Sequence, residues 1–129
     1  MAERYLIDTS VVIKYLNASL SIDSLNSLDK IIDEESRISF ITEIELQVWN
    51  PTNPDDISIY QEFVASSHVI GIDSNIIRET ISIRKQYRIK LPDALIAATA
   101  IVNDLVLIAD NDKDYGKVSN LKYINPAKN

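Results

Sequence analysis

The apolar run at residues 105–109 constrains the fold of this chain more than any other segment. It reads LVLIA and contains no polar residue. Unbroken runs of this kind are typical of strands that are buried on both faces of a parallel sheet, because a strand with one solvated face alternates apolar and polar residues. Consecutive parallel strands are joined by crossovers that usually contain a helix, so the run predicts an α/β fold.

Apolar and amphipathic segments alternate along the rest of the chain as such a fold requires. Strands are predicted at 4–7, 37–41, 68–72, 105–109 and 121–125. Helices are predicted at 9–17, 20–35, 42–49, 54–67, 74–87 and 92–103. Thr42 and Ser74 are the expected N-caps of two of these helices. No linker or repeat interrupts the pattern, so we expect a single domain over residues 1–129, with helices on both faces of a parallel sheet.

Composition excludes several classes of function. The chain has no cysteine, which excludes disulfides, thiolate zinc sites and a cysteine nucleophile, and its single His68 excludes a ribonuclease that uses paired histidines. Two glycines, Gly71 and Gly116, are too few for the glycine-rich phosphate loops of nucleotide-binding folds. A net charge of −6 argues against nucleic-acid binding by bulk electrostatics. The start, MAERYLID, has no signal-peptide core and no membrane span, so we expect a cytoplasmic protein.

Acidic residues follow several predicted strands or open the helices beyond them. Asp8 comes directly after the first strand, and Glu45 lies in the first predicted turn of the helix after the second strand. Asp93 follows Pro92 at the start of a later helix, and DNDKD at 110–114 follows the fourth strand. The carboxyl ends of parallel strands share one edge of the sheet, where ligands of open α/β folds bind. We therefore expect these acids to converge on one cleft.

Carboxylates crowded into a cleft repel one another unless a divalent cation lies among them, and oxygen ligands suit Mg²⁺. The pattern therefore indicates a metal site. Each acid also has an ordinary structural explanation. Asp8 can cap a helix, Glu45 and Asp93 can complement a helix dipole, and DNDKD can be a solvated turn. Their combined placement is what favours the metal site.

Three stretches of the chain resemble the PIN-domain family and, most closely, its VapC-type toxin ribonucleases. They are YLIDTSVVIKYL at 5–16, ITEIEL at 41–46 and IKLPDALIAATAIVNDLVLIADNDKDYGKVSNLKYINP at 89–126. The resemblance implies a three-layer PIN-like fold with a five-stranded parallel sheet flanked by helices. It also implies a metal-dependent endoribonuclease that cleaves RNA, forms a homodimer and is held inactive by a small protein antitoxin.

By the same resemblance, Asp8, Glu45 and Asp93 are the catalytic acids, which hold Mg²⁺ or Mn²⁺. A metal on Asp8 and Asp93 would activate a water and stabilise charge on the phosphate, while Glu45 positions the metal or orients the water. Ser10 resembles the hydroxyl that supports the first acid by hydrogen bonding, although it can equally cap the helix.

The chain departs from the family after the fourth strand. The usual run Thr-Arg-Asn-x-x-Asp-Phe appears as ADNDKDY at 109–115. Register places Asn111 at the fourth ligand position, and a neutral amide oxygen would hold a second metal weakly unless Asp110 or Asp112 supplies the charge. Either one or two metal ions are compatible with this pattern.

The densest basic stretch immediately precedes the Asp93 motif. It contains Arg84, Lys85, Arg88 and Lys90. These cations are candidates for guiding an RNA backbone toward the metal, and they are equally explained as cations that favour a helix C-terminus.

Two other functions compete with the nuclease. A receiver-type phosphorylation switch also binds Mg²⁺ with acids at strand ends, but it needs paired acids after the first strand, where this chain has Asp8, Thr9 and Ser10. It also needs a phosphoacceptor after the third strand, where Asp73 is the nearest acid. A PIN-like module that binds RNA or a protein without cutting is favoured if Asn111 abolishes metal affinity.

Overall fold

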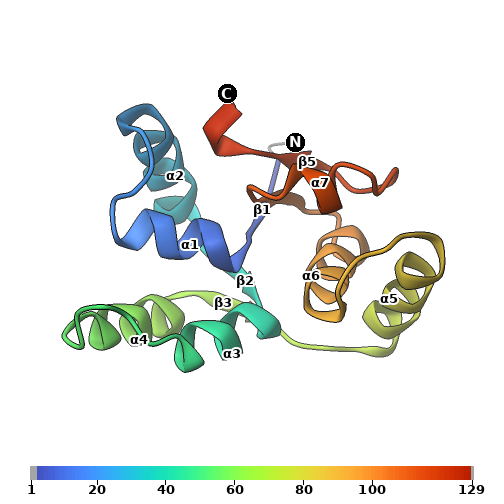
Figure 1. Cartoon of the computed structure of the whole chain (residues 1–129), viewed down its shortest axis with the longest axis horizontal. Coiled ribbons are helices and arrows are strands. Elements are labelled where there is room, and N and C mark those ends of the chain that lie inside the picture. Colours follow the sequence, from blue (N-terminus) through green and yellow to red (C-terminus); the bar gives the residue numbers. More distant parts are fainter. Residues whose placement is uncertain (1–2, 129) are drawn as a thin grey trace.

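The structure, a computed structural model, describes residues 3–128 (Figure 1). Its strands are β1 (Tyr5–Ile7), β2 (Arg37–Ser39), β3 (His68–Ile70), β4 (Val106–Ile108) and β5 (Tyr123–Ile124). Its helices are α1 (Thr9–Leu16), α2 (Ile22–Glu34), α3 (Phe40–Val48), α4 (Asp56–Ser66), α5 (Ser74–Gln86), α6 (Leu91–Val102), α7 (Asp112–Tyr115) and the 3-10 helix η1 (Pro126–Lys128). Each predicted strand and helix overlaps an element of the expected kind, but Phe40 and Ile41, predicted as the end of the second strand, are the first residues of α3. None of the helices described is long and apolar enough to cross a membrane.

All strand pairs among the described residues are parallel, but the strands do not form one continuous sheet. β1, β4 and β5 form a three-stranded sheet in the order β1-β4-β5, and β2 pairs with β3 in a separate two-stranded sheet. β1 also contacts β2. Asp8 and Ser39 turn the chain into α1 and α3 directly after these strands, which leaves little extended backbone to pair. The prediction of a single five-stranded sheet is therefore correct for the strands and their direction and wrong for their continuity.

Alternate residues of the central strands belong to two separate cores. Leu6 of β1 and Leu107 of β4 pack with helices α5 and α6, whereas the next residues, Ile7 and Ile108, pack with α1, α2, α3 and α4. The separation follows from the alternation of side chains along a strand. All four side chains are buried. Helices thus cover both sides of the strands, and the burial of β4 on both faces confirms the interpretation of LVLIA.

Two predicted N-caps are wrong. α3 is capped by Ser39, whose Oγ accepts a hydrogen bond from the N–H of Thr42 at 3.2 Å, so Thr42 lies inside the helix. α5 is capped by Asp73, whose Oδ1 accepts from the N–H of Ile76 at 2.8 Å, and Ser74 is the first helical residue. Serine, threonine and aspartate all cap well, and two of them occur close together at each of these helix starts, so the sequence pattern does not decide between them.

Candidate active site

A cleft of about 370 Å³ lies at the carboxyl ends of β1 and β4. Its lining consists of Asp8, Thr9, Ser10, Ile13, Glu45, Asp93, Asp110, Asn111 and Tyr115. These residues come from α1, α3, α6, α7 and the segments after β1 and β4, which Figure 1 shows around the centre of the molecule. The cleft therefore brings together the three acids predicted as catalytic, the predicted supporting serine, and two of the three other candidate ligands.

Asp8 is held at the base of this cleft by the strand before it and the helix after it. Its N–H donates to the carbonyl of Ile108 at 2.9 Å, which extends the β1–β4 pairing to the acid itself. Its Oδ2 accepts from the N–H of Ser10 at 3.3 Å and lies 3.1 Å from the Ser10 hydroxyl, so Asp8 is also the N-cap of α1. Burial raises the pKa of Asp8 to about 6, against the lowering effect of hydrogen bonds from Ser10 and Tyr115. The structural role and the proposed catalytic role thus fall on one residue.

Asp93 lies in the first turn of α6, which has Pro92 near its start. The carboxyl is half-buried, and burial raises its pKa, with the charges of Asp114 and Glu45 acting in the same direction. The hydrogen bond from Tyr115 and, to a smaller extent, the charge of Lys90, the N-cap residue of α6, act in the opposite direction. Asp93 is therefore an acid whose negative charge is only partly compensated by its surroundings.

Tyr115 is a residue of this cleft for which the sequence analysis had no role. It stands where the family's usual run ends in phenylalanine, and its side chain is 1% exposed. Its hydroxyl lies 3.1 Å from Asp8 Oδ1 and 3.3 Å from Asp93 Oδ1, so one donor faces two carboxylates. Burial and the charges of Asp8 and Asp93 raise the pKa of Tyr115, which keeps the hydroxyl protonated. A tyrosine directly after the polar run DNDKD gives no sequence signal of this contact.

Glu45 reaches the cleft from the second turn of α3, one turn later than predicted, because the helix begins at Phe40. The Thr9 hydroxyl donates to Glu45 Oε1 at 2.6 Å. The hydroxyl of Thr42 lies 2.9 Å from that of Thr9 and is able to donate to it. The chain Thr42–Thr9–Glu45 thus orients the acid, and the sequence analysis had missed both threonines.

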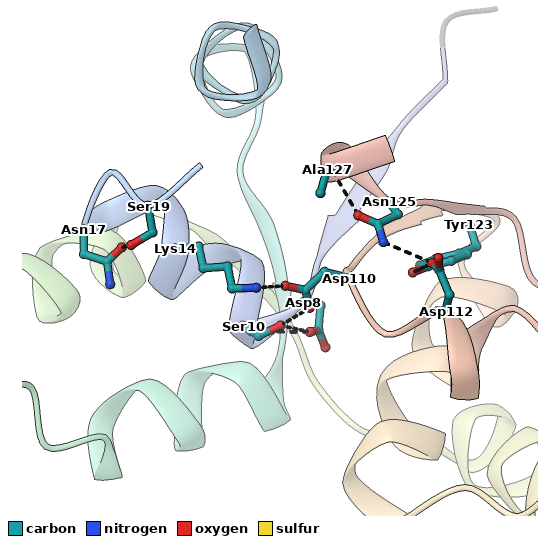
Figure 2. Close-up of polar contacts among 10 residues, drawn as sticks. All are labelled: Asp8, Ser10, Lys14, Asn17, Ser19, Asp110, Asp112, Tyr123, Asn125 and Ala127. Atoms are coloured by element: carbon teal, nitrogen blue, oxygen red, sulfur yellow. Dashed lines mark hydrogen bonds and ion pairs between the residues drawn. The ribbon is translucent and has the colours of Figure 1, made fainter. Parts of the chain in front are cut away.

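Asp110 lines the cleft but is paired with a cation. Lys14 of α1 forms an ion pair with Asp110 Oδ2, and the Ser10 hydroxyl lies 2.7 Å from Asp110 Oδ1 (Figure 2). Burial alone would raise the pKa of Asp110, but the hydrogen bonds from Lys14 and Ser10 outweigh it and lower the pKa. Ser10 has one hydroxyl proton to share between Asp8 and Asp110, and the shorter contact is the one with Asp110.

Asn111 and Asp112 have other partners. Asn111 caps the short helix α7, whereas the structural alternative considered for this segment was a solvated turn. Its Oδ1 accepts from the N–H of Asp114 at 3.3 Å, and its Nδ2 donates to Asp114 Oδ2 at 2.9 Å. Asp112 does not line the cleft, and Lys128 pairs with its carboxylate. Tyr123 and Asn125 donate to Asp112 Oδ1 at 2.6 and 3.1 Å (Figure 2). The hydrogen bond from Lys128, followed by those from Tyr123 and Asn125, lowers the pKa of Asp112 to about 2. The sequence analysis passed over Asp114, whose charge acts on Asp93.

The predicted RNA-guiding cations are exposed and lie beside the cleft only in part. Arg84, Arg88 and Lys90 line an open hollow of about 400 Å³ with Tyr87 and Ile89, and Lys85 is not among the lining residues. Lys90 does not line the acidic cleft, but its charge lowers the pKa of Asp93.

The chemistry of the cleft suits a hard divalent cation. It offers carboxylate, hydroxyl and amide oxygens, which are the ligands that Mg²⁺ and Mn²⁺ prefer. Within residues 3–128, however, no three acidic or imidazole groups already surround a common point closely enough to form a metal site. Of the three predicted catalytic acids, Asp8 is buried, whereas Glu45 and Asp93 are partly exposed.

Comparison with known proteins places this geometry in context. The chain matches the PIN domain over residues 5–121, and no curated protein matches it. Among solved structures, a toxin-antitoxin complex from Klebsiella pneumoniae is 25% identical with a TM-score of 0.75, over 95% of this chain and 97% of that chain. VapBC2 from Rickettsia felis, bound to a DNA fragment from its promoter, is 22% identical with a TM-score of 0.78, over 94% and 97%. DNA-bound VapBC from Salmonella typhimurium is 18% identical with a TM-score of 0.81, over 97% and 99%, so the fold is shared well beyond the sequence likeness.

Proposed function

This chain belongs to the PIN-domain family, and from that premise we propose that it is an endoribonuclease that hydrolyses RNA phosphodiesters with Mg²⁺ or Mn²⁺. The pair formed by Asp8 and Asp93 carries the proposal. Burial raises the pKa of both carboxyls, and both face the same tyrosine hydroxyl at the base of a cleft. A bound cation would compensate the negative charges of two carboxylates placed this way, whereas without a cation the charges repel each other.

Asp8 and Asp93 would hold the metal, and Glu45 would complete the acidic set. A bound Mg²⁺ or Mn²⁺ supplies an acidified water at neutral pH and stabilises charge on the phosphate. The Thr9 hydroxyl keeps Glu45 Oε1 in place, which leaves the other carboxylate oxygen to orient the attacking water or to contact the metal. The neighbouring hollow of Arg84, Arg88 and Lys90 would hold the RNA backbone, because phosphate contacts position a nucleic acid without reading its sequence.

We further propose that the protein is the toxin of a toxin-antitoxin pair, acts as a homodimer and is captured by a small protein antitoxin. The solved structures it resembles are toxin-antitoxin complexes. α3 and its C-cap residue also present apolar side chains to solvent: Ile44, Val48 and Trp49 are 55%, 75% and 46% exposed. Apolar residues clustered on one surface are typical of protein–protein contacts. Light scattering that shows only monomer, with and without an antitoxin candidate encoded beside this gene, would contradict this part of the proposal.

The nuclease is tested with a structured RNA and the purified chain. Cleavage is expected with Mn²⁺ or Mg²⁺ and is expected to stop with EDTA. Asp8→Asn keeps a residue that caps helices well, so it should leave the fold intact and abolish cleavage. Cleavage that continues undiminished in EDTA, or in Asp8→Asn, would refute the proposal.

A PIN-like module that binds RNA or a protein without cutting is the second candidate. The observation that favours it is the lack of a ready-made three-acid site among residues 3–128. It predicts RNA binding that is independent of metal and no cleavage under any condition. The receiver-type switch fits less well, since Asp73, the acid after β3, caps α5 and does not line the cleft.

A further inference from the structure

We propose that Tyr115 is a positioning residue whose hydroxyl holds the carboxylates of Asp8 and Asp93 toward each other, so that one divalent cation binds both. The inference rests on the proposed function and extends it to a residue that itself contacts neither metal nor RNA. Its basis is the shared contact: one hydroxyl oxygen lies 3.1 Å from Asp8 Oδ1 and 3.3 Å from Asp93 Oδ1.

The direction of this contact leaves the cleft open for a cation. Tyr115 is buried, so its hydroxyl approaches the two acids from the protein interior. Asp93 is only half-buried and faces the cleft together with Glu45. The hydroxyl therefore orients the two carboxylates without filling the solvent side, where a cation would enter.

The position of the hydroxyl is itself fixed by the turn around α7. The N–H of Tyr115 donates to the carbonyl of Asn111 at 2.9 Å, and the ring packs against Tyr123 with centroids 5.9 Å apart. Gly116 closes the turn so tightly that a Cβ there would lie 2.6 Å from the carbonyl oxygen of Asp112. Because the Tyr115 hydroxyl is held in place, it restricts the positions of the two carboxylates beside it.

One hydroxyl carries one proton, so Tyr115 donates fully to one carboxylate at a time. The bridge therefore limits the separation of the two acids but does not remove their repulsion, which is left for the cation. Removing the hydroxyl takes the hydrogen bond of Tyr115 from Asp93 and leaves Asp8 with only the contacts from Ser10 to its Oδ2, so the two carboxylates are free to turn apart. Hydrogen-bond partners of metal ligands are typically worth about 10- to 100-fold in metal affinity for this reason.

The test compares Tyr115→Phe with Tyr123→Phe in the full chain. Both substitutions remove only a hydroxyl that donates to an aspartate, but the partner of Tyr123 is Asp112, outside the cleft. Titration calorimetry with MnCl₂ should show about tenfold weaker Mn²⁺ binding in Tyr115→Phe and unchanged binding in Tyr123→Phe. Because the hydroxyl acts through metal affinity, RNA cleavage by Tyr115→Phe should return toward the wild-type rate at saturating Mn²⁺.

A second measurement does not depend on the variant folding. In the wild type, the Cζ resonance of Tyr115 should shift during a Mg²⁺ titration, while that of Tyr15, whose hydroxyl donates to the exposed Asp29, should not. Equal or tighter Mn²⁺ binding by Tyr115→Phe, or a Tyr115 resonance that ignores bound Mg²⁺, would overturn the inference. If the wild type and Tyr115→Phe bind Mn²⁺ equally well, this inference alone is overturned. If the wild type binds neither Mn²⁺ nor Mg²⁺, the proposed function is overturned as well.

Discussion

The acids at the carboxyl ends of the strands fall into two groups with opposite electrostatics. Asp8 and Asp93 have pKa values raised by burial, and hydroxyl and backbone donors are their hydrogen-bond partners. Asp110 and Asp112 have lowered pKa values, because Lys14 and Lys128 pair with them. Asp8 and Asp110 follow paired strands, so proximity to the sheet edge does not separate the groups. Ion pairs with lysine separate the groups: Asp110 and Asp112 have such pairs, and Asp8 and Asp93 are the acids proposed to hold the metal.

The largest expected effect is on catalysis. Asp93→Asn should lower the rate of RNA cleavage by about 100-fold or more, since even an indirect partner of a metal site is worth up to about 100-fold. Asp112→Asn should leave the rate nearly unchanged, because the Asp112 carboxylate is paired with Lys128 and accepts a hydrogen bond from Tyr123. Initial rates with a structured RNA at fixed Mn²⁺ measure both. Equal losses in the two variants would remove the distinction between the groups.

Stability of the metal-free protein should fall as pH rises. The folded-state pKa of Asp8 is about 6, above its ordinary value of 3.8, so between these values the folded chain binds more protons than the unfolded chain. The free energy of unfolding in EDTA should therefore decrease from about pH 4 to about pH 6 by as much as about 3 kcal/mol from this residue. Urea unfolding at several pH values measures the slope, and Asp8→Asn should flatten most of it. A wild type and an Asp8→Asn variant with the same pH profile would contradict the buried, uncompensated state of Asp8.

Charge removal should have opposite effects on the two groups. Asp93→Asn removes the repulsion between Asp93 and the neighbouring acids and is expected to stabilise the metal-free protein. The gain should be only about 1 kcal/mol, because solvent screens the half-exposed carboxyl. Asp112→Asn removes a carboxylate that is paired and should lower the melting temperature. The Asp93 variant should also lose most of the stabilisation that added Mn²⁺ gives the wild type. Melts with EDTA and with excess metal decide the matter, and a destabilised Asp93→Asn with an intact metal shift would make Asp93 a purely structural helix-start acid.

The smallest expected effect is on Mn²⁺ affinity, when Asp110 loses the lysine that pairs with it. Lys14→Met leaves Asp110 without its cation and makes the cleft one charge more negative. Mn²⁺ should then bind a few-fold tighter, because an exposed charge of this kind is worth about 0–1 kcal/mol. Lys122→Met, which removes the exposed partner of Asp104 away from the cleft, is the matched control and should have no effect. Weaker Mn²⁺ binding in Lys14→Met would mean that Lys14 supports the site through Ser10 and Asp110.

Much of the fold was predictable because local patterns and the global fold agree. The run at 105–109 predicted a strand buried on both faces, and the strand–helix order placed Asp8 and Asp110 at one edge. The continuity of the sheet was not predictable, since it depends on how soon Asp8 and Ser39 turn the chain into helices. Choosing Ser39 over Thr42 as the cap of α3 also depends on tertiary contacts, because Thr42 is occupied with Thr9.

The acidic residues of the cleft were predictable from the sequence, whereas the hydroxyl groups that contact them were not. Strand ends and helix starts bring the acids together through backbone topology, which the sequence pattern encodes. Thr9, Thr42 and Tyr115 contribute through side-chain contacts between residues 22 to 107 positions apart, and such pairings leave no periodic signal. The choice among Asn111, Asp110 and Asp112 as a further ligand depended on side-chain partners that the sequence does not show, such as the hydrogen bonds of Asn111 with Asp114 at the start of α7.

The division of β1 and β4 between two cores limits where this chain can change in length. Inserting one residue just before β4 would move Leu107 and Ile108 to opposite faces and mismatch both cores at once, since side chains alternate along a strand. The connection at 52–55, in contrast, is exposed and joins two helices, so added residues there would extend into solvent. Reporter domains, affinity tags or cross-linking handles are therefore best inserted at 52–55, where they leave the strand register intact.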